Sequence, residues 1–134
     1  MAGIRRKART IALQALYEID CASHNPEVTL KRLLEEVTLP EEAASFAQEL
    51  VYGVIQNKQR IDASIRTYAP IWPLEQISVI DRNILRLAIF EILINNKVPL
   101  KAAINEAIEL AKTFGSQNSA KFVNGVLGSV SANK

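Results

Sequence analysis

The sequence predicts an all-α protein of about seven helices, packed as two small antiparallel bundles. Apolar residues recur every three or four positions along most of the chain, which is the period of one helix face. No stretch shows the alternation of a strand, and the segments between periodic stretches are short, which favours antiparallel neighbours. A chain of 134 residues fits a single domain, 1–134. Within it we expect an N-terminal bundle over about 4–69 and a C-terminal bundle over about 74–130.

The first helix is predicted over 4–19. Seven apolar residues share one face of this segment: Ile4, Ala8, Ile11, Ala12, Ala15, Leu16 and Ile19. We expect this face to dock on the rest of the fold, while the basic residues of the segment and Gln14 point elsewhere. Leu13 and Tyr17 form a second, narrower stripe between the two.

Three further helices are predicted before residue 70. The polar segment 23–27 is typical of a turn, and a short helix is expected over 30–37. Pro40 suits a first helical position because its φ is fixed, and the two glutamates that follow complement the positive end of the helix dipole. We expect this third helix to run to about Asn57, and a fourth helix to end near Tyr68.

A rigid link with Trp72 between two prolines precedes the next helix. We expect Trp72 to be a packing anchor between the bundles rather than a platform for base stacking. Ser78, followed three residues later by Asp81, resembles a capping box and predicts a helix through about Asn95. Because this helix is apolar on most of its circumference, it either forms the centre of the fold or lends one flank to another protein.

The last two helices are separated by a short polar turn. Residues 100–114 give the cleanest amphipathic pattern of the chain, with Gly115 expected as the C′ cap. Ser116 or Ser119 can cap the final helix. Gly125 lies inside this helix, where glycine costs about 1 kcal/mol relative to alanine, so we expect a close helix approach there.

Four cations, Arg5, Arg6, Lys7 and Arg9, precede Glu18, the first acidic residue. They account for all of the positive balance, since the remaining chain has 12 basic and 14 acidic residues. Guanidinium groups bind phosphate oxygens through two charge-assisted hydrogen bonds and stay charged at physiological pH. The cluster therefore indicates a polyanion, above all nucleic acid, as a partner. The alternative is a solvated, frayed terminus that only aids solubility.

The sequence offers no recognisable catalytic, metal or cofactor site. Cys21 has no second cysteine, and we expect it to cap the inner face of the first helix; His24 lies in a polar turn without a group to orient its ring. Glu106 and Glu109 are spaced as a solvated helix face would place them. There is no nucleotide-binding glycine motif, no signal peptide and no apolar run long enough for a membrane span. We therefore expect a cytoplasmic, non-enzymatic protein without cofactor or metal.

Three stretches together resemble the NusB family of bacterial transcription antitermination factors. They are RRKARTIALQALYEID, DRNILRLAIFEI, and AINEAIELAKTFG followed by KFVNGVLG, and they occur in the family's order over nearly the whole chain. The resemblance implies an all-helical fold of two three-helix bundles and no catalytic site. It also implies binding of single-stranded boxA RNA with the ribosomal protein NusE, and assembly of antitermination complexes on RNA polymerase, notably for ribosomal RNA operons.

The resemblance also implies which residues bind RNA. The matching positions are Arg5, Arg6, Lys7 and Arg9 in the arginine-rich motif, and Asn118, Lys121 and Phe122 near the C-terminus. An exposed Phe122 could stack on a base, whereas the periodicity predicts that it points inward; the two interpretations conflict. Asn118 stands where the family often has an acidic residue, so its neutral side chain removes a repulsive charge and is expected to strengthen RNA binding.

The NusE contact is expected along the central helix and the link before it. The matching positions are Tyr17, Gln76, Ile80, Asp81, Ile84 and Arg86. A few apolar anchors beside a selective charge suit a specific, exchangeable interface. The alternative for Ile80 and Ile84 is ordinary core.

Two other functions stay open. A NusB-like domain also occurs in RNA cytosine methyltransferases, so the chain could be an RNA-targeting module, although its end at Lys134 speaks against this. It could also be a protein-interaction scaffold, such as a homodimer that hides the arginine cluster.

Overall fold

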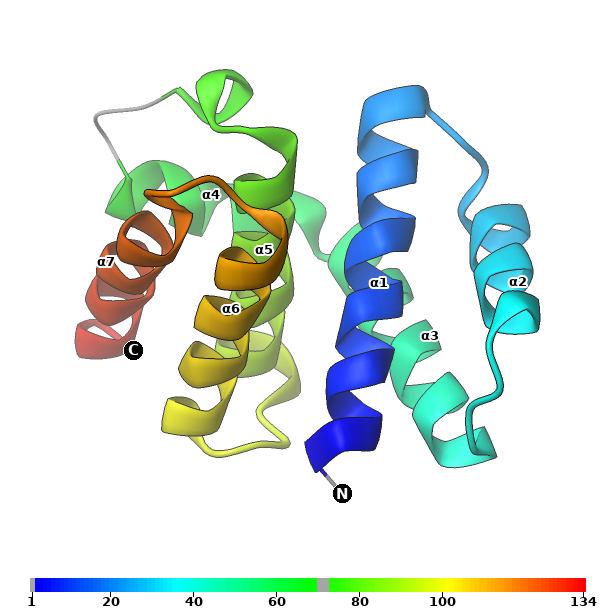
Figure 1. Ribbon diagram of the computed structural model, residues 1–134. Helices are drawn as coiled ribbons and strands as arrows, with labels where there is room; N and C mark the ends of the chain where they lie inside the picture. Colours follow the sequence, from blue (N-terminus) through cyan, green and yellow to red (C-terminus); the bar gives the residue numbers. More distant parts are fainter. Residues whose placement is uncertain (1, 70–72) are drawn as a thin grey trace.

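The fold consists of helices in two groups (Figure 1). The computed structural model describes residues 2–69 and 73–134, and within these ranges it contains helices and no strand. The elements are α1 Ala2–Ala22, α2 Pro26–Glu36, α3 Glu41–Gln56, α4 Lys58–Tyr68, the short 3-10 helix η1 Leu74–Gln76, α5 Val79–Ile89, the π-helical turn η2 Phe90–Asn95, α6 Leu100–Phe114 and α7 Ser119–Ala132. The predicted all-α class is confirmed.

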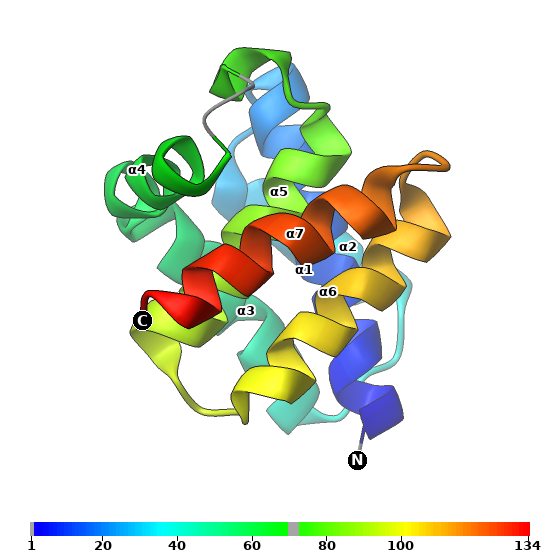
Figure 2. The ribbon, with the colours of Figure 1, turned by 90° about the vertical axis from the view of Figure 1, so that its left-hand side faces the viewer.

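Helix α1 stands between the two groups. On one side it packs against the first group, α2 and α3. On the other side it packs against α5, which with α6 and α7 forms the second group (Figures 1 and 2). Figure 2 shows α7 crossing in front of α5 and lying beside α6. The start of α1, which carries the basic cluster, therefore lies next to the second group.

Helix α4 departs from the expected division of the chain. We placed residues up to 69 in the N-terminal bundle, but α4 packs mainly against α5 and α7 and contacts α3 less. The short link at Asn57, whose side chain donates a hydrogen bond to the Gly53 carbonyl at 2.8 Å, lets the chain leave α3 and cross to the other group. The expected role of Trp72 lies outside the described residues.

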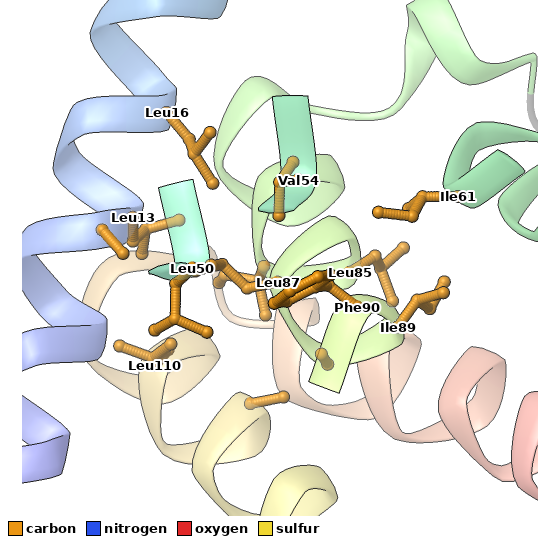
Figure 3. Close-up of a cluster of buried hydrophobic side chains, with 14 of the residues drawn as sticks. Leu13, Leu16, Leu50, Val54, Ile61, Leu85, Leu87, Ile89, Phe90 and Leu110 are labelled. Carbon is orange, nitrogen blue, oxygen red and sulfur yellow. The ribbon is translucent and has the colours of Figure 1, made fainter. Parts of the chain in front are cut away.

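One hydrophobic core joins both groups of helices. Figure 3 shows Leu13 and Leu16 from α1 and Leu50 from α3 facing Leu87 of α5 and Leu110 of α6. All five side chains are at most 5% exposed. The apolar face predicted for the first helix is confirmed, since its members are buried or partly buried against this core. The helix predicted after Ser78 was expected either at the centre of the fold or as a flank for another protein. It is α5, which lies at the centre of the fold.

The capping residues confirm some predicted boundaries and correct others. The Ser78 hydroxyl accepts a hydrogen bond from the Asp81 amide at 3.1 Å, as the capping-box pattern predicted. The predicted turn over 23–27 is too long, because Asn25 caps α2 and Pro26 is already its first residue. The predicted helix through Asn95 is α-helical only to Ile89 and then continues as a π-helical turn.

The turn between α6 and α7 also differs from expectation. Gly115 ends α6 in an extended conformation, with φ −90°, and not in the left-handed conformation of a C′ glycine cap. Ser119 does not cap α7: its buried hydroxyl accepts a hydrogen bond from the Ser116 amide at 2.8 Å and so closes the turn. Neither predicted serine cap is formed.

Two glycines inside helices have opposite surroundings. A Cβ at Gly53 of α3 would lie 2.2 Å from the Phe90 ring, so the absence of a side chain lets this ring pack on the helix backbone. At Gly125 of α7 a Cβ would meet nothing within 4 Å, and the residue is exposed. The predicted close approach at Gly125 is wrong, and the sequence pattern did not single out Gly53. Cys21 is exposed and does not cap the inner face of α1.

Candidate nucleic-acid interface

The four cations of the basic cluster have different environments in the structure. Arg6 forms a two-point ion pair with Glu106 of α6: its Nε lies 3.1 Å from Oε1 and its Nη2 lies 2.8 Å from Oε2. The Arg6 side chain keeps 52% of its surface exposed, whereas that of Glu106 keeps 16%. The hydrogen bond from Arg6 outweighs burial and holds the pKa of Glu106 below its usual value, so this carboxylate is ionised at neutral pH. The expectation that Glu106 belongs to a solvated face is wrong.

Arg9 is a core residue. Its Nε and Nη2 donate to the two carboxylate oxygens of Glu91 at 2.9 and 2.8 Å, and both side chains are at most 6% exposed. Its Nη1 also lies 3.7 Å from Glu106. We expected Arg9 to point away from the docking face of its helix, but the π-helical turn η2 presents Glu91 to it. Arg9 has little surface left for a ligand.

The remaining two cations are exposed. The Arg5 guanidinium lies over the Phe46 ring, 5.1 Å from its centroid, and Arg9 lies over the same ring at 5.2 Å. This cation–π contact holds Arg5 in place without neutralising its charge. In the part of the chain that the structure describes, neither Arg5 nor Lys7 pairs with a carboxylate. These two side chains are the best placed of the cluster to receive phosphate.

The other predicted RNA-binding residues lie at the far end of α6. Asn118 and Lys121 are exposed, and Phe122 is partly buried against the core. Phe122 and Asn118 line a cavity of about 240 Å³ with Gln76 and Asp81. The side chain of Phe122 therefore contacts the core, as the periodicity predicted, and also borders a surface cavity; its stacking on a base stays a prediction.

The two predicted RNA-binding groups are not brought together. The start of α1 and the turn between α6 and α7 lie at opposite ends of the molecule (Figure 1). Glu106, which pairs with Arg6, lies eight residues before Phe114, the last residue of α6, so about 12 Å of this helix separates them. A ligand that contacts both groups must therefore be extended along the face formed by α1 and α6.

An apolar groove lies on α1 between these two ends. It has a volume of about 430 Å³. Tyr17 and Phe114, the two large apolar side chains exposed here, are 39% and 44% exposed. The lining residues are Thr10, Leu13, Gln14, Tyr17, Glu18, Ile80 and Phe114. Tyr17 and Ile80, both predicted partner residues, thus share one groove, whereas Gln76 and Asp81 border the cavity beside Phe122.

Two predicted partner residues are buried instead. Ile84 has no exposed surface and belongs to the core, as its alternative interpretation held. Arg86 is 4% exposed: its Nε and Nη2 lie 2.8 and 3.1 Å from the carboxylate of Asp62, and its Nη1 lies 2.9 Å from Asp20. The Arg86 side chain joins α1, α4 and α5 and leaves nothing for a partner to contact. The prediction that Ile84 and Arg86 bind a partner is therefore wrong.

Asp20 of α1 completes the buried ion-pair network around Arg86 and links the two groups of helices. Its carboxylate accepts hydrogen bonds from Arg82 at 2.7 and 3.0 Å and from Asn83 at 3.0 Å. Burial alone would raise the pKa of Asp20, but these hydrogen bonds and the charge of Arg86 outweigh it and lower the pKa to about 2. This ion-pair network fixes the orientation of α1 relative to α5.

Sequence reasoning missed the acidic partners of the arginine cluster. Glu91 and Glu106 lie 82 and 100 positions from Arg9 and Arg6, and no local spacing signals contacts at that distance. It also missed Phe114 as an exposed wall of the groove, because this residue continues the apolar spacing of 100–114. The RNA-binding and partner-binding roles of the exposed residues stay predictions.

Ranges 2–69 and 73–134 contain no group of three His, Cys, Asp or Glu side chains that could hold a metal ion. In these ranges, too, every helix is too short or too polar to span a membrane.

Comparisons with known proteins give one consistent result. The model of the NusB family matches residues 6–132. A transcription antitermination protein NusB of Dehalococcoides mccartyi is 59% identical over 127 residues, which cover 95% of this chain and 89% of that protein. Its counterpart in Roseiflexus sp. (strain RS-1) is 50% identical over 132 residues, 97% of this chain and 93% of that protein.

Solved structures agree with the sequence relatives. NusB of T. maritima superposes with a TM-score of 0.89 at 37% identity, over 96% of this chain and 90% of that one. A chain from a crystal structure of the antitermination factors NusB and NusE in complex with dsRNA superposes with a TM-score of 0.91 at 26% identity, over the full length of both chains. The family match over almost the whole chain, the relatives at up to 59% identity and the shared fold lead to one conclusion: the chain belongs to the NusB family.

Proposed function

We propose that this chain is a transcription antitermination factor. It binds the boxA element of nascent RNA, notably in ribosomal RNA transcripts, together with NusE, and helps to assemble the antitermination complex on RNA polymerase. The observation that carries this proposal is the full-length superposition, with a TM-score of 0.91, on a chain from a complex of NusB, NusE and dsRNA. Relatives described as transcription antitermination proteins support the same role.

Phosphate binding is assigned to the start of α1. Arg5 and Lys7 are exposed, and Arg6 keeps half of its surface open beside them. These contacts hold a single strand in place but do not select its sequence. Selection must come from base edges and stacking, which we assign to Asn118, Lys121 and the open edge of Phe122 at the other end of α6.

NusE is assigned to the groove on α1. The groove begins at Thr10, one residue after Arg9, and reaches Phe114, four residues before Asn118. A protein that fills it therefore lies between the two RNA-binding ends and extends the same face. Its apolar wall, with Tyr17 and Ile80 as anchors and charged Glu18 at its margin, is typical of a specific but exchangeable interface.

The proposed role is that of an adaptor, without chemistry of its own. Affinity comes from several weak contacts to RNA and to NusE, each of which raises the apparent affinity for the other. Because its ligand is a transcript still attached to RNA polymerase, we place the protein in the cytoplasm.

Binding of a boxA-type single-stranded RNA and of a scrambled RNA tests this proposal. Both are titrated with and without NusE, against the wild-type chain and against Arg5→Ala combined with Lys7→Ala. A matched control is Lys58→Ala combined with Arg60→Ala, which removes the same charge from exposed positions of α4. We expect a preference for boxA that NusE increases, and an affinity for both RNAs that the first pair of substitutions lowers and that the control pair preserves.

Two outcomes would contradict the proposal. Equal, weak binding of both RNAs without an effect of NusE would leave a protein-interaction scaffold. A control pair that loses as much RNA affinity as the α1 pair would show that only overall charge matters, and not the basic cluster.

A further inference from the structure

The carboxylate of Glu106 lies inside the basic cluster. It makes two hydrogen bonds with Arg6, at 3.1 and 2.8 Å, and its Oε1 lies 3.7 Å from Nη1 of Arg9. Only 16% of its side chain is exposed, against 52% for Arg6. An anion is thus held against the surface that would receive phosphate.

Two of the four positive charges of the cluster, those of Arg6 and Arg9, are compensated. Arg6 and Arg9 carry two positive charges, and Glu91 and Glu106 carry two negative ones within 3.7 Å. Glu106 occupies the edge of the Arg6 guanidinium formed by Nε and Nη2, one of the two edges through which arginine binds an oxyanion with two parallel hydrogen bonds. A phosphate that approaches Arg6 must displace Glu106 or use the remaining edge beside it.

Rigidity makes this competition effective. Glu106 is anchored because its helix carries Ala103, Ala107 and Leu110 into the core, all at most 5% exposed. An internal carboxylate held at contact distance competes with external phosphate at a high effective concentration. The competition lowers affinity most for ligands that bind through phosphate contacts alone, because they have no other contacts to offset it.

We propose that Glu106 is a specificity-determining residue, an internal competitor that occupies Arg6 and suppresses binding of RNA that makes only phosphate contacts. This inference rests on the proposed RNA-binding function. RNA that also makes base contacts, or that is held by a protein partner, overcomes the competition. Glu106 thereby converts a general phosphate site into one that needs a second set of contacts.

The test compares Glu106→Gln with Glu109→Gln. Both changes remove one negative charge from α6, three residues apart, but Glu109 is 45% exposed and pairs with Lys112 instead of an arginine of the cluster. Binding of a scrambled and of a boxA-type single-stranded RNA of equal length is measured over a series of salt concentrations. Circular dichroism confirms that each variant is folded.

We expect Glu106→Gln to bind scrambled RNA about fivefold more tightly at 0.1 M salt, with a log–log salt slope steeper by about 0.7, because one more phosphate contact becomes available. Its preference for boxA over scrambled RNA should fall. Glu109→Gln should stay within about twofold of wild type, since it leaves Arg6 paired. The gain must disappear when Arg6→Ala is combined with Glu106→Gln.

Two results would overturn the inference. The first is a folded Glu106→Gln variant that binds scrambled RNA no more tightly than Glu109→Gln does. The second is a gain that persists in the Arg6→Ala background, which would assign the effect to the general field of α6. If the wild type shows no preference for boxA, the proposed function fails, yet the comparison on scrambled RNA still decides the role of Glu106. If Glu106→Gln is unfolded, Glu106→Ala replaces it, alone and combined with Arg6→Ala. Tighter binding of scrambled RNA by the single variant that disappears in the double variant supports the inference; no gain in the single variant, or a gain that persists in the double variant, overturns it.

Discussion

The Arg9 guanidinium forms a two-point ion pair with the Glu91 carboxylate, at 2.9 and 2.8 Å, although both residues are almost fully buried. Arg9 comes from α1 and Glu91 from the π-helical turn after α5, so the pair ties the start of α1 to the second group of helices. A residue of the basic cluster thus has a structural role, and its neighbours present their charges from a fixed helix.

Replacing Arg9 by alanine should destabilise the fold by about 3–5 kcal/mol, because Glu91 would remain as a buried charge without a partner. Lys7→Ala removes the same charge from an exposed position and should change the free energy of unfolding by less than about 0.5 kcal/mol. Urea unfolding followed by circular dichroism measures both. An Arg9→Ala variant as stable as Lys7→Ala would show that the pair adds nothing to stability.

Acid should loosen the contact between α1 and α5. The pKa of Asp20 is about 2 in the folded chain and near 3.8 when unfolded, so its contribution is complete above about pH 4 and is lost as the pH falls toward 2. Asp20→Asn should therefore lower stability at pH 7 and flatten the dependence of stability on pH between 4 and 2. Urea midpoints over this range give the measurement; parallel curves for both proteins would contradict it.

Alanine at Gly53 and at Gly125 should have opposite effects. Gly53→Ala should be destabilising by about 1–3 kcal/mol, since its methyl group would overlap the buried Phe90 ring. Gly125→Ala should stabilise the chain by up to about 1 kcal/mol, because the position is helical, exposed and unobstructed. Thermal unfolding of the two variants compares them directly. Stabilisation by Gly53→Ala would show that Phe90 moves aside without cost.

The salt dependence of RNA binding should be weaker than four cations suggest. Four phosphate contacts to a single strand would give a log–log slope of about −2.8, but Arg9 is buried and Glu106 occupies Arg6. We therefore expect the cluster to contribute about −1.4, through Arg5 and Lys7. The slope of wild type minus that of the variant with both residues changed to alanine measures this contribution. A further difference of about −0.7 on adding Arg6→Ala would mean that Arg6 also reaches phosphate.

Introducing a charge at Asn118 should weaken RNA binding. Asn118 is exposed at the start of α7, beside Lys121, and Asn118→Asp would place a carboxylate next to the proposed RNA path. We expect a two- to fivefold loss of affinity, equivalent to about 0.5–1 kcal/mol of repulsion. Asn133→Asp, at the other end of the same helix, serves as the control. Unchanged RNA affinity in Asn118→Asp would remove the support for a role of Asn118.

The sequence by itself determined the helices. Local properties carry this information: the three-to-four spacing of apolar residues, the cap formed by Ser78 and the restart at Pro40 all act within a few positions. The boundaries that failed, at Asn25 and after Ile89, depend on one side-chain hydrogen bond and on a change of helix type, which periodicity does not report. Family motifs in the sequence likewise indicated the basic start of the chain as a candidate RNA-binding surface.

Only the tertiary structure decided which charged residues are available to a ligand. In the sequence, Arg9 is indistinguishable from Arg5, and Arg86 occupies a position that could face a partner. Each is buried because a carboxylate far away in the chain, Glu91 for Arg9 and Asp62 for Arg86, meets it in the folded state. The physical reason is that the cost of burying a charge is offset only by a partner at contact distance, and packing of whole helices determines which residues come that close.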